Sequence, residues 1–346
     1  MAKEISLDTL YPKRRQDTVT LNYHPVYTTE GTDTVLSNGI VTIRVSLHGA
    51  ELQAIRSDET GREYLWQADP KYWKRHSPVL FPIVGSVWNG KYRSHGSEFA
   101  LGQHGFARDM DFLLIEEGTD AEGNPQALYV LRSSEATLAK YPYRFRLEIG
   151  YVLKGRAVEV IWRVMNPSRE EELHFQIGAH PAFYWPLLSN ADIEAGVTQQ
   201  DAVLSQSTAR GYFRLSDGAK TYRKSVITEK GCVDPAQSGA VTLDAEGYLP
   251  LDTETFAHDA LIFEDSQVQT VTLCDADRRP YLTLRSEAPL MGLWSPPGKN
   301  APFVCIEPWY GRCDRVQYDG KYEDKDWIQT LAPLATFESR YQIILG

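Results

Sequence analysis

The residues best suited to chemistry lie near the C-terminus, where the apolar run Phe303–Ile306 leads into Glu307 and two aromatic residues follow, Trp309 and Tyr310. A carboxylate in apolar surroundings is costly unless it is hydrogen-bonded or paired, so we expect Glu307 at the mouth of a strand, facing a pocket. Aromatic faces beside a hydrogen-bonding acid suit a ligand with apolar C–H patches and a rim of hydroxyls. The segment therefore favours a pocket for a sugar ring.

The same glutamate also has a purely structural interpretation. Arg312 and Arg315 follow closely in the sequence. An ion pair with either arginine would satisfy the carboxylate without any ligand, and most perturbed carboxylates are structural. This segment alone leaves the two interpretations evenly balanced.

Three further stretches help to decide between these two interpretations of Glu307. Together with the C-terminal segment they resemble one known family. They read WKRHSPVLFPIVG at residues 73–85, QHGFARD at 103–109 and GAHPAF at 178–183, and the first segment contributes CIEPW at 305–309. In this order and at these separations they resemble the aldose 1-epimerase (galactose mutarotase) superfamily, particularly its LacX-like branch. The resemblance covers roughly residues 30 to 345.

The resemblance implies acid–base chemistry on an aldose ring. Interconverting the two anomers requires a base for the anomeric hydroxyl and an acid for the ring oxygen, which a Glu and a His can supply near neutral pH from opposite sides of the ring. By motif, the family's base corresponds to Glu307 and its acid to His180. A second family histidine, which donates a hydrogen bond near the ring oxygen, corresponds to His104. This chemistry needs no cofactor and no metal.

Both histidines have simpler interpretations as well. His180 could be a core imidazole at a proline turn, and His104 a turn residue before Gly105. Four residues are expected to bind the substrate, the first two by hydrogen bonds and the last two by stacking: Arg75, Asp259, Trp309 and Phe183. Asp259 could instead cap a turn through its own backbone. Trp185 and Trp294 are aromatic too but lie outside the motifs.

Composition narrows the classes of partner. The chain has 346 residues and a net charge of −10, which argues against nucleic acid because phosphate backbones attract clustered Lys and Arg. Its four cysteines have neither the density of a disulfide framework nor the spacing of a zinc site. The N-terminus lacks the apolar segment of a signal peptide, and no run approaches the ~18 apolar residues of a membrane span. We expect a cytoplasmic protein with a small-molecule sugar substrate, and the sequence does not predict its oligomeric state.

The surrounding pattern predicts an all-β fold, a large antiparallel β-sandwich. Apolar residues alternate with polar ones after the turn Asn38-Gly39, and again in a long hairpin over 145–164. Residues 1–30 read as a polar extension, and 31–346 as a single domain, which the resemblance makes a mutarotase-like super-sandwich. Further strands are expected at 128–131, 260–263, 270–274, 281–285, 303–306 and 337–345, a short helical turn at 134–140 and an irregular loop over 192–226.

Other functions remain open from the sequence. A non-catalytic sugar-binding or sensor protein could keep the same fold and pocket. A hexose-6-phosphate 1-epimerase could use Lys74, Arg75 and Arg108 as a phosphate site, although the acidic charge favours neutral sugars. A glycoside hydrolase could use two carboxylates, Glu307 and Asp259.

Overall fold

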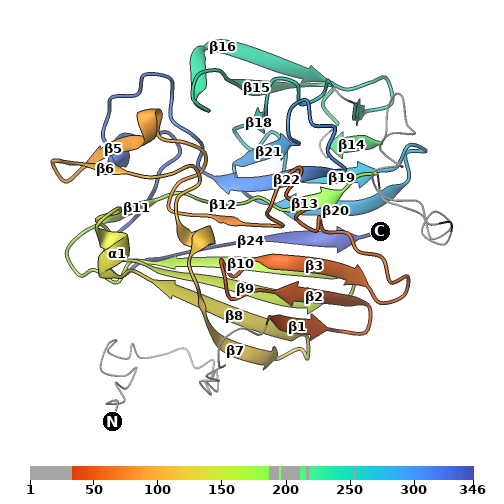
Figure 1. The fold of residues 1–346 in the computed structure, drawn as a ribbon, viewed down its shortest axis with the longest axis horizontal. Coiled ribbons are helices and arrows are strands. Elements are labelled where there is room, and N and C mark those ends of the chain that lie inside the picture. Colours follow the sequence, from red (N-terminus) through yellow and green to blue (C-terminus); the bar gives the residue numbers. More distant parts are fainter. Residues whose placement is uncertain (1–32, 187–194, 196–210, 216–217, 253) are drawn as a thin grey trace.

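The computed structural model describes residues 33–186, 195, 211–215, 218–252 and 254–346 (Figure 1). Antiparallel sheets dominate this part of the chain, which confirms the predicted all-β class. Its helices are short: α1 (Glu135–Leu138), within the predicted turn, and the 3₁₀ turns η2 (Trp88–Gly90), η3 (Ala107–Asp109) and η4 (Tyr322–Asp324). No helix in the described ranges is long and apolar enough to span a membrane. The predicted extension over 1–30 lies outside the described residues.

The larger sheet contains nine strands and is built around the predicted hairpin. Its two long strands pair in antiparallel register, so Ile149 lies opposite Trp162, and both side chains are buried in the core. In spatial order the strands are β17 (Tyr248–Pro250), β14 (Tyr212–Leu215), β19 (Thr270–Cys274), β20 (Pro280–Ser286), β24 (Thr336–Leu345), β10 (Ala157–Met165), β9 (Arg146–Lys154), β8 (Pro125–Arg132) and β7 (Leu113–Thr119).

The second sheet carries the C-terminal motif on a strand flanked by others on both sides. That strand is β22 (Phe303–Tyr310), which pairs with β21 (Leu290–Trp294) on one side and with β12 (Ile177–Ala179) and β13 (Ala182–Tyr184) on the other. The sheet is completed by β16 (Val233–Thr242), β15 (Thr221–Ile227), β18 (Leu261–Phe263) and β4 (Val79–Leu80).

Three small sheets complete the fold. One is three-stranded and contacts β8, the second is a hairpin, and the third pairs two strands that are distant in the sequence. Their strands are β1 (Thr34–Ser37), β2 (Val41–Val45) and β3 (Leu52–Ser57), then β5 (Lys91–Ser94) with β6 (Ser97–Ala100), and β11 (Leu173–Phe175) with β23 (Gln329–Leu331).

The core forms between the inner faces of the two large sheets. Trp162 and Ile343 from the first sheet and Leu293 and Ile306 from the second belong to one continuous cluster of buried side chains. Burying each side chain of this size contributes about 1.5–3 kcal/mol. The second sheet is thereby fixed against the first, and its strands provide a rigid support for side chains on their other face.

Two expectations about local structure are wrong. The stretch expected to be irregular contains β14 and β15 where it is described, because Tyr222 and Phe213 are buried at strand positions that the weak periodicity did not reveal. The strand predicted over 303–306 continues to Tyr310, since Pro308 and Trp309 pair with Met291 and Leu290. Glu307 therefore lies within a strand, not at its mouth.

Candidate functional site

A cavity of about 340 Å³ lies over the second sheet, and most of the predicted site residues converge on it. The β22 side chains on this side are Glu307 and Trp309, two residues apart as the strand period requires. The wall also includes His104, Arg108, His180, Asp259, Trp73 and Trp294.

Two glycines create the space for Trp309 on the sheet. Gly178 of β12 and Gly292 of β21 are its neighbours on either side, and a Cβ added at them would lie 2.6 Å and 2.5 Å from the Trp309 ring. Such contacts are far shorter than a side chain tolerates, so only glycine allows the indole to lie flat here. The glycine that begins the GAHPAF motif thus has a physical role in shaping the cavity wall.

His180 is held against Glu307 by the turn between β12 and β13. Its backbone N–H donates to the Pro78 carbonyl at 3.1 Å. The side chain brings Nε2 to 3.4 Å from Glu307 Oε2. The two groups therefore lie side by side, and the expectation that they stand on opposite sides of a sugar ring is wrong, because no ring fits between them.

Aromatic rings fix the imidazole of His180 in place. Trp73 stacks on it at 4.7 Å between ring centroids, with planes 29° apart. Trp294 and His104 meet it edge to face at 5.4 Å and 5.6 Å. The ring can therefore change its protonation state with little change in orientation.

Burial perturbs both members of the pair. Glu307 is 1% exposed, and its Oε2 has no hydrogen-bond partner of good geometry, so desolvation raises the pKa of its carboxyl well above the ordinary value. The nearby Trp309 N–H opposes this rise, but it forms no well-aligned hydrogen bond, so burial decides the direction. Burial, helped by the charges of Arg108 and Arg75, lowers the pKa of His180 to about 3. Burial therefore disfavours the charged form of both groups.

His104 is oriented by a reciprocal backbone contact. Its N–H donates to the Gly85 carbonyl at 2.8 Å, while the Gly85 N–H donates to His104 Nδ1 at 3.0 Å. Burial, reinforced by His180, holds the pKa of His104 well below its ordinary value, so the ring is neutral and carries its proton on Nε2. Gly105 next to it has φ +72°, and a Cβ there would lie 2.3 Å from the Phe81 carbonyl oxygen. The turn thus requires glycine at position 105, and His104 Nε2 remains as a hydrogen-bond donor.

The arginine assignment requires correction. Arg75 donates to Asp109 Oδ1 at 2.7 Å and is not among the described residues that line the cavity. Arg108 lines it instead, held by a bond from its Nη2 to the Gln103 carbonyl at 2.7 Å. Both arginines lie in the segments that the resemblance singled out, but the sequence could not show that Arg108, on η3, lines the cavity while Arg75 pairs with Asp109.

The predicted binding residues fall into two groups. Asp259 and Trp309 line the cavity, and Asp259 accepts a hydrogen bond from the Ala260 N–H at 2.8 Å, the turn-capping role considered as its alternative. Phe183 is fully buried in the core and offers no face to a ligand, because both sides of β13 are covered. The aromatic walls come instead from Trp73 and Trp294, with Trp309. Sequence reasoning did not assign Trp73 a role, although it begins the first motif.

Glu307 and two neighbouring side chains are of residue types that can bind a metal ion. The donor atoms of His180, Cys305 and Glu307 lie within 4.8 Å of one another. Burial raises the pKa of the Cys305 thiol well above its ordinary value, and a protonated thiol is a poor ligand. The expectation that the site needs no metal stays a prediction.

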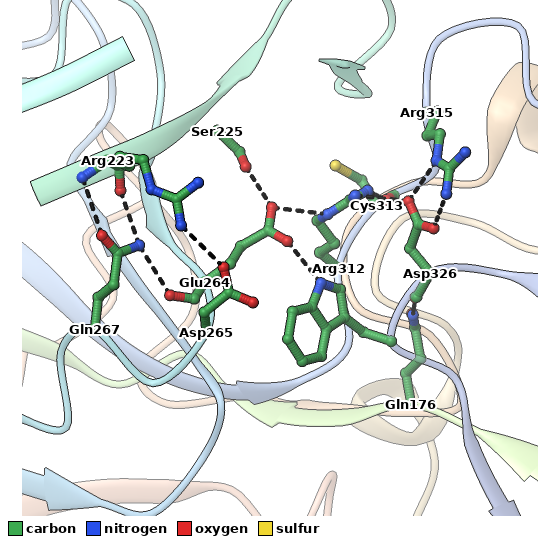
Figure 2. Close-up of polar contacts among 11 residues, drawn as sticks. Gln176, Arg223, Ser225, Glu264, Asp265, Gln267, Arg312, Cys313, Arg315 and Asp326 are labelled. Carbon is green, nitrogen blue, oxygen red and sulfur yellow. Dashed lines mark hydrogen bonds and ion pairs between the residues drawn. The ribbon is translucent and has the colours of Figure 1, made fainter. Parts of the chain in front are cut away.

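The structural interpretation of Glu307 does not hold, because both candidate arginines have other partners. Figure 2 shows Arg312 between Glu264 and Asp326, with Nε 3.0 Å from Glu264 Oε1 and Nη2 2.6 Å from Asp326 Oδ2. Arg315 also binds Asp326, through Nε at 2.6 Å. Glu307 contacts neither arginine and faces the cavity.

Comparison with known proteins places the chain in a family. A family model described as "Aldose 1-epimerase" matches residues 33–343. Protein LacX (chromosomal) of Lactococcus lactis subsp. lactis is 31% identical over 318 residues, which cover 90% of this chain and 98% of that protein. The chain belongs to the aldose 1-epimerase family. Within this family it falls in the LacX-like branch, as the motifs indicated.

Solved structures agree with this placement in the aldose 1-epimerase family. A galactose mutarotase related enzyme from Lactobacillus acidophilus is 29% identical with a TM-score of 0.79, covering 91% of this chain and 97% of that one. A galactose mutarotase-like protein from Lactobacillus casei is 23% identical with a TM-score of 0.77, covering 91% and 100%. The second likeness speaks for the fold alone.

Proposed function

We propose that the protein is an aldose 1-epimerase that interconverts the α and β anomers of an aldohexose. The observation that carries this proposal is the contact between His180 Nε2 and Glu307 Oε2, 3.4 Å apart at the cavity wall, where Oε2 forms no well-aligned hydrogen bond with any described residue. The anomeric hydroxyl and the ring oxygen are bonded to the same carbon. A base and an acid that lie side by side therefore match the two atoms on which they must act.

The reaction consists of paired proton transfers. The Glu307 carboxylate takes the anomeric hydroxyl proton as the bond between the anomeric carbon and the ring oxygen breaks, and the ring oxygen takes a proton from His180. The products are an open-chain aldehyde and a free hydroxyl. Rotation of the aldehyde followed by the reverse transfers gives the other anomer. His104 Nε2–H stabilises the negative charge that develops on the ring oxygen.

The number of protons held by Glu307 and His180 together suits this reaction. Burial favours the state of the free pair that holds one proton, on Glu307, with His180 neutral. Moving that proton to His180 produces the carboxylate base and the imidazolium acid without exchange with solvent. The stacked Trp73 ring favours the cationic imidazole through its π face. Because the two groups share one proton, their apparent pKa values belong to the pair.

The test is polarimetry on freshly dissolved α-glucose and α-galactose with the purified protein, beside glucose 6-phosphate and a panel of chromogenic glycosides. We expect faster mutarotation of at least one neutral hexose and no glycoside cleavage. His180→Asn should reduce the rate by about a hundredfold or more. Binding without mutarotation would indicate a sensor instead, and hydrolysis of a glycoside would indicate that Glu307 and Asp259 act as a carboxylate pair. Greater efficiency on glucose 6-phosphate than on every neutral hexose would indicate a hexose-6-phosphate 1-epimerase in which Arg108 binds the phosphate.

A further inference from the structure

A second cavity, of about 260 Å³, adjoins the first. Its floor is aromatic and buried, formed in part by Trp185 and Phe256. Its rim carries the exposed carboxylates of Asp252 and Glu254. The lining also includes Asn300, whose Oδ1 is buried without a hydrogen-bond partner among the described residues. An unpaired buried acceptor is costly, and a ligand hydroxyl would satisfy it.

Two chain segments form walls of both cavities. Along the first segment, Ala257 lines the second cavity and Asp259 lines the first. Along the other, Trp294 lines the first cavity and Ser295 the second. Pro297 belongs to both walls. The two cavities are therefore neighbours across one proline, within the reach of a ligand that has two linked rings.

Resting on the function proposed above, we propose that the second cavity binds a second sugar unit, so that the substrate is a reducing disaccharide or another glycosylated hexose. The reducing ring lies in the first cavity, with its anomeric carbon at Glu307 and His180, and the attached sugar crosses Pro297. The aromatic side chains of this lining match the apolar face of that second ring, and its carboxylate and amide groups match the ring's hydroxyls. A free hexose would leave Asn300 Oδ1 unpaired.

The first test compares kcat/KM for mutarotation of maltose, cellobiose and lactose with that for glucose and galactose. The reducing hexose is glucose in all three disaccharides. We expect kcat/KM for at least one of them to exceed that for glucose by about tenfold or more. Asn300→Ala and Glu254→Ala should each reduce the disaccharide value by about fivefold or more and leave the hexose value unchanged. Glu170→Ala, which alters an exposed glutamate in a distant turn, is the matched control and should change neither. Equal efficiency on disaccharide and hexose, or equal losses on both in the variants, would overturn the inference.

A binding measurement separates this inference from the proposed function. Methyl β-maltoside, methyl β-cellobioside and methyl β-lactoside cannot open their rings, so calorimetry reports their binding without catalysis. We expect at least one to bind more tightly than methyl β-glucoside, and Asn300→Ala to remove the difference. If this difference appears but no sugar mutarotates, the second site stands and the epimerase proposal fails. If hexoses mutarotate but the difference is absent, the second site fails alone.

Discussion

Two carboxylates on the second sheet and its loops, one partly buried and one fully buried, show how similar groups acquire different roles. Glu264, directly after β18, accepts hydrogen bonds from Arg312 Nε at 3.0 Å, from Trp327 Nε1 at 2.6 Å and from the Ser225 hydroxyl. Glu307 on β22 has an oxygen with no hydrogen-bond partner and a histidine at 3.4 Å. The first carboxylate is satisfied by the protein and stabilises it. The second is left unsatisfied at a cavity, where a ligand can complete its contacts.

Breaking the satisfied cluster should produce the largest effect on stability. Arg312→Met would leave Glu264 and Asp326 short of a buried cationic partner, and we expect a loss of about 3–5 kcal/mol in the free energy of unfolding. Urea titration measures it. The control is Arg223→Met, which breaks the Arg223–Asp265 pair, 78% and 60% exposed, and should change stability by no more than about 0.5 kcal/mol. Similar losses in the two variants would mean that the cluster is not a stabilising element.

Replacing the unsatisfied carboxylate of Glu307 should raise stability, in contrast to the loss expected at Arg312. Glu307→Gln should raise the free energy of unfolding by about 1–3 kcal/mol at neutral pH, because it removes a buried group that is poorly paired. Since the folded pKa of Glu307 is raised, the stability it contributes is present below the unfolded pKa and is lost as pH rises through the folded pKa. The advantage of the variant should therefore grow as pH rises above the ordinary pKa of a glutamate, until the folded pKa is passed. Urea titrations at several pH values test this, and a variant less stable than the parent at pH 9 would contradict it.

A smaller effect on rate is expected at His104. His104→Asn should slow mutarotation by about tenfold, less than loss of the base or the acid, because an amide can still donate a hydrogen bond to the ring oxygen. Its amide can also occupy the reciprocal contact with Gly85. Steady-state polarimetry measures the rate, and circular dichroism should show an unchanged fold. A loss as large as that of His180→Asn would assign His104 to proton transfer itself.

No effect is expected from removing metal ions. Exhaustive dialysis against a chelator should leave the mutarotation rate unchanged, because Glu307 and His180 supply both proton transfers. The pH profile should be bell-shaped, since the productive pair holds one proton and activity falls when it gains a second or loses its only one. A rate that the chelator abolishes and one divalent ion restores would mean that His180, Cys305 and Glu307 bind that ion.

The sequence predicted what depends on local pattern and left open what depends on distant partners. The hairpin over 145–164 follows from strict alternation, and the motifs brought Glu307, His180 and His104 to one cavity. The partner of Arg312 could not be predicted, because Glu264 lies 48 residues earlier and carries no local signal. The prediction that Phe183 stacks on the substrate was wrong for a related reason. Its exposure depends on which distant elements cover the two faces of β13.

The central claim is that the unsatisfied carboxylate is the base. Its most direct test is the anomer exchange rate, measured by magnetisation-transfer NMR on the preferred sugar, in the parent, Glu307→Gln and Glu264→Gln. We predict a loss of about a hundredfold or more for Glu307→Gln, with a stable fold and retained sugar binding, and a much smaller change for Glu264→Gln. Exchange in Glu307→Gln as fast as in the parent would contradict the account.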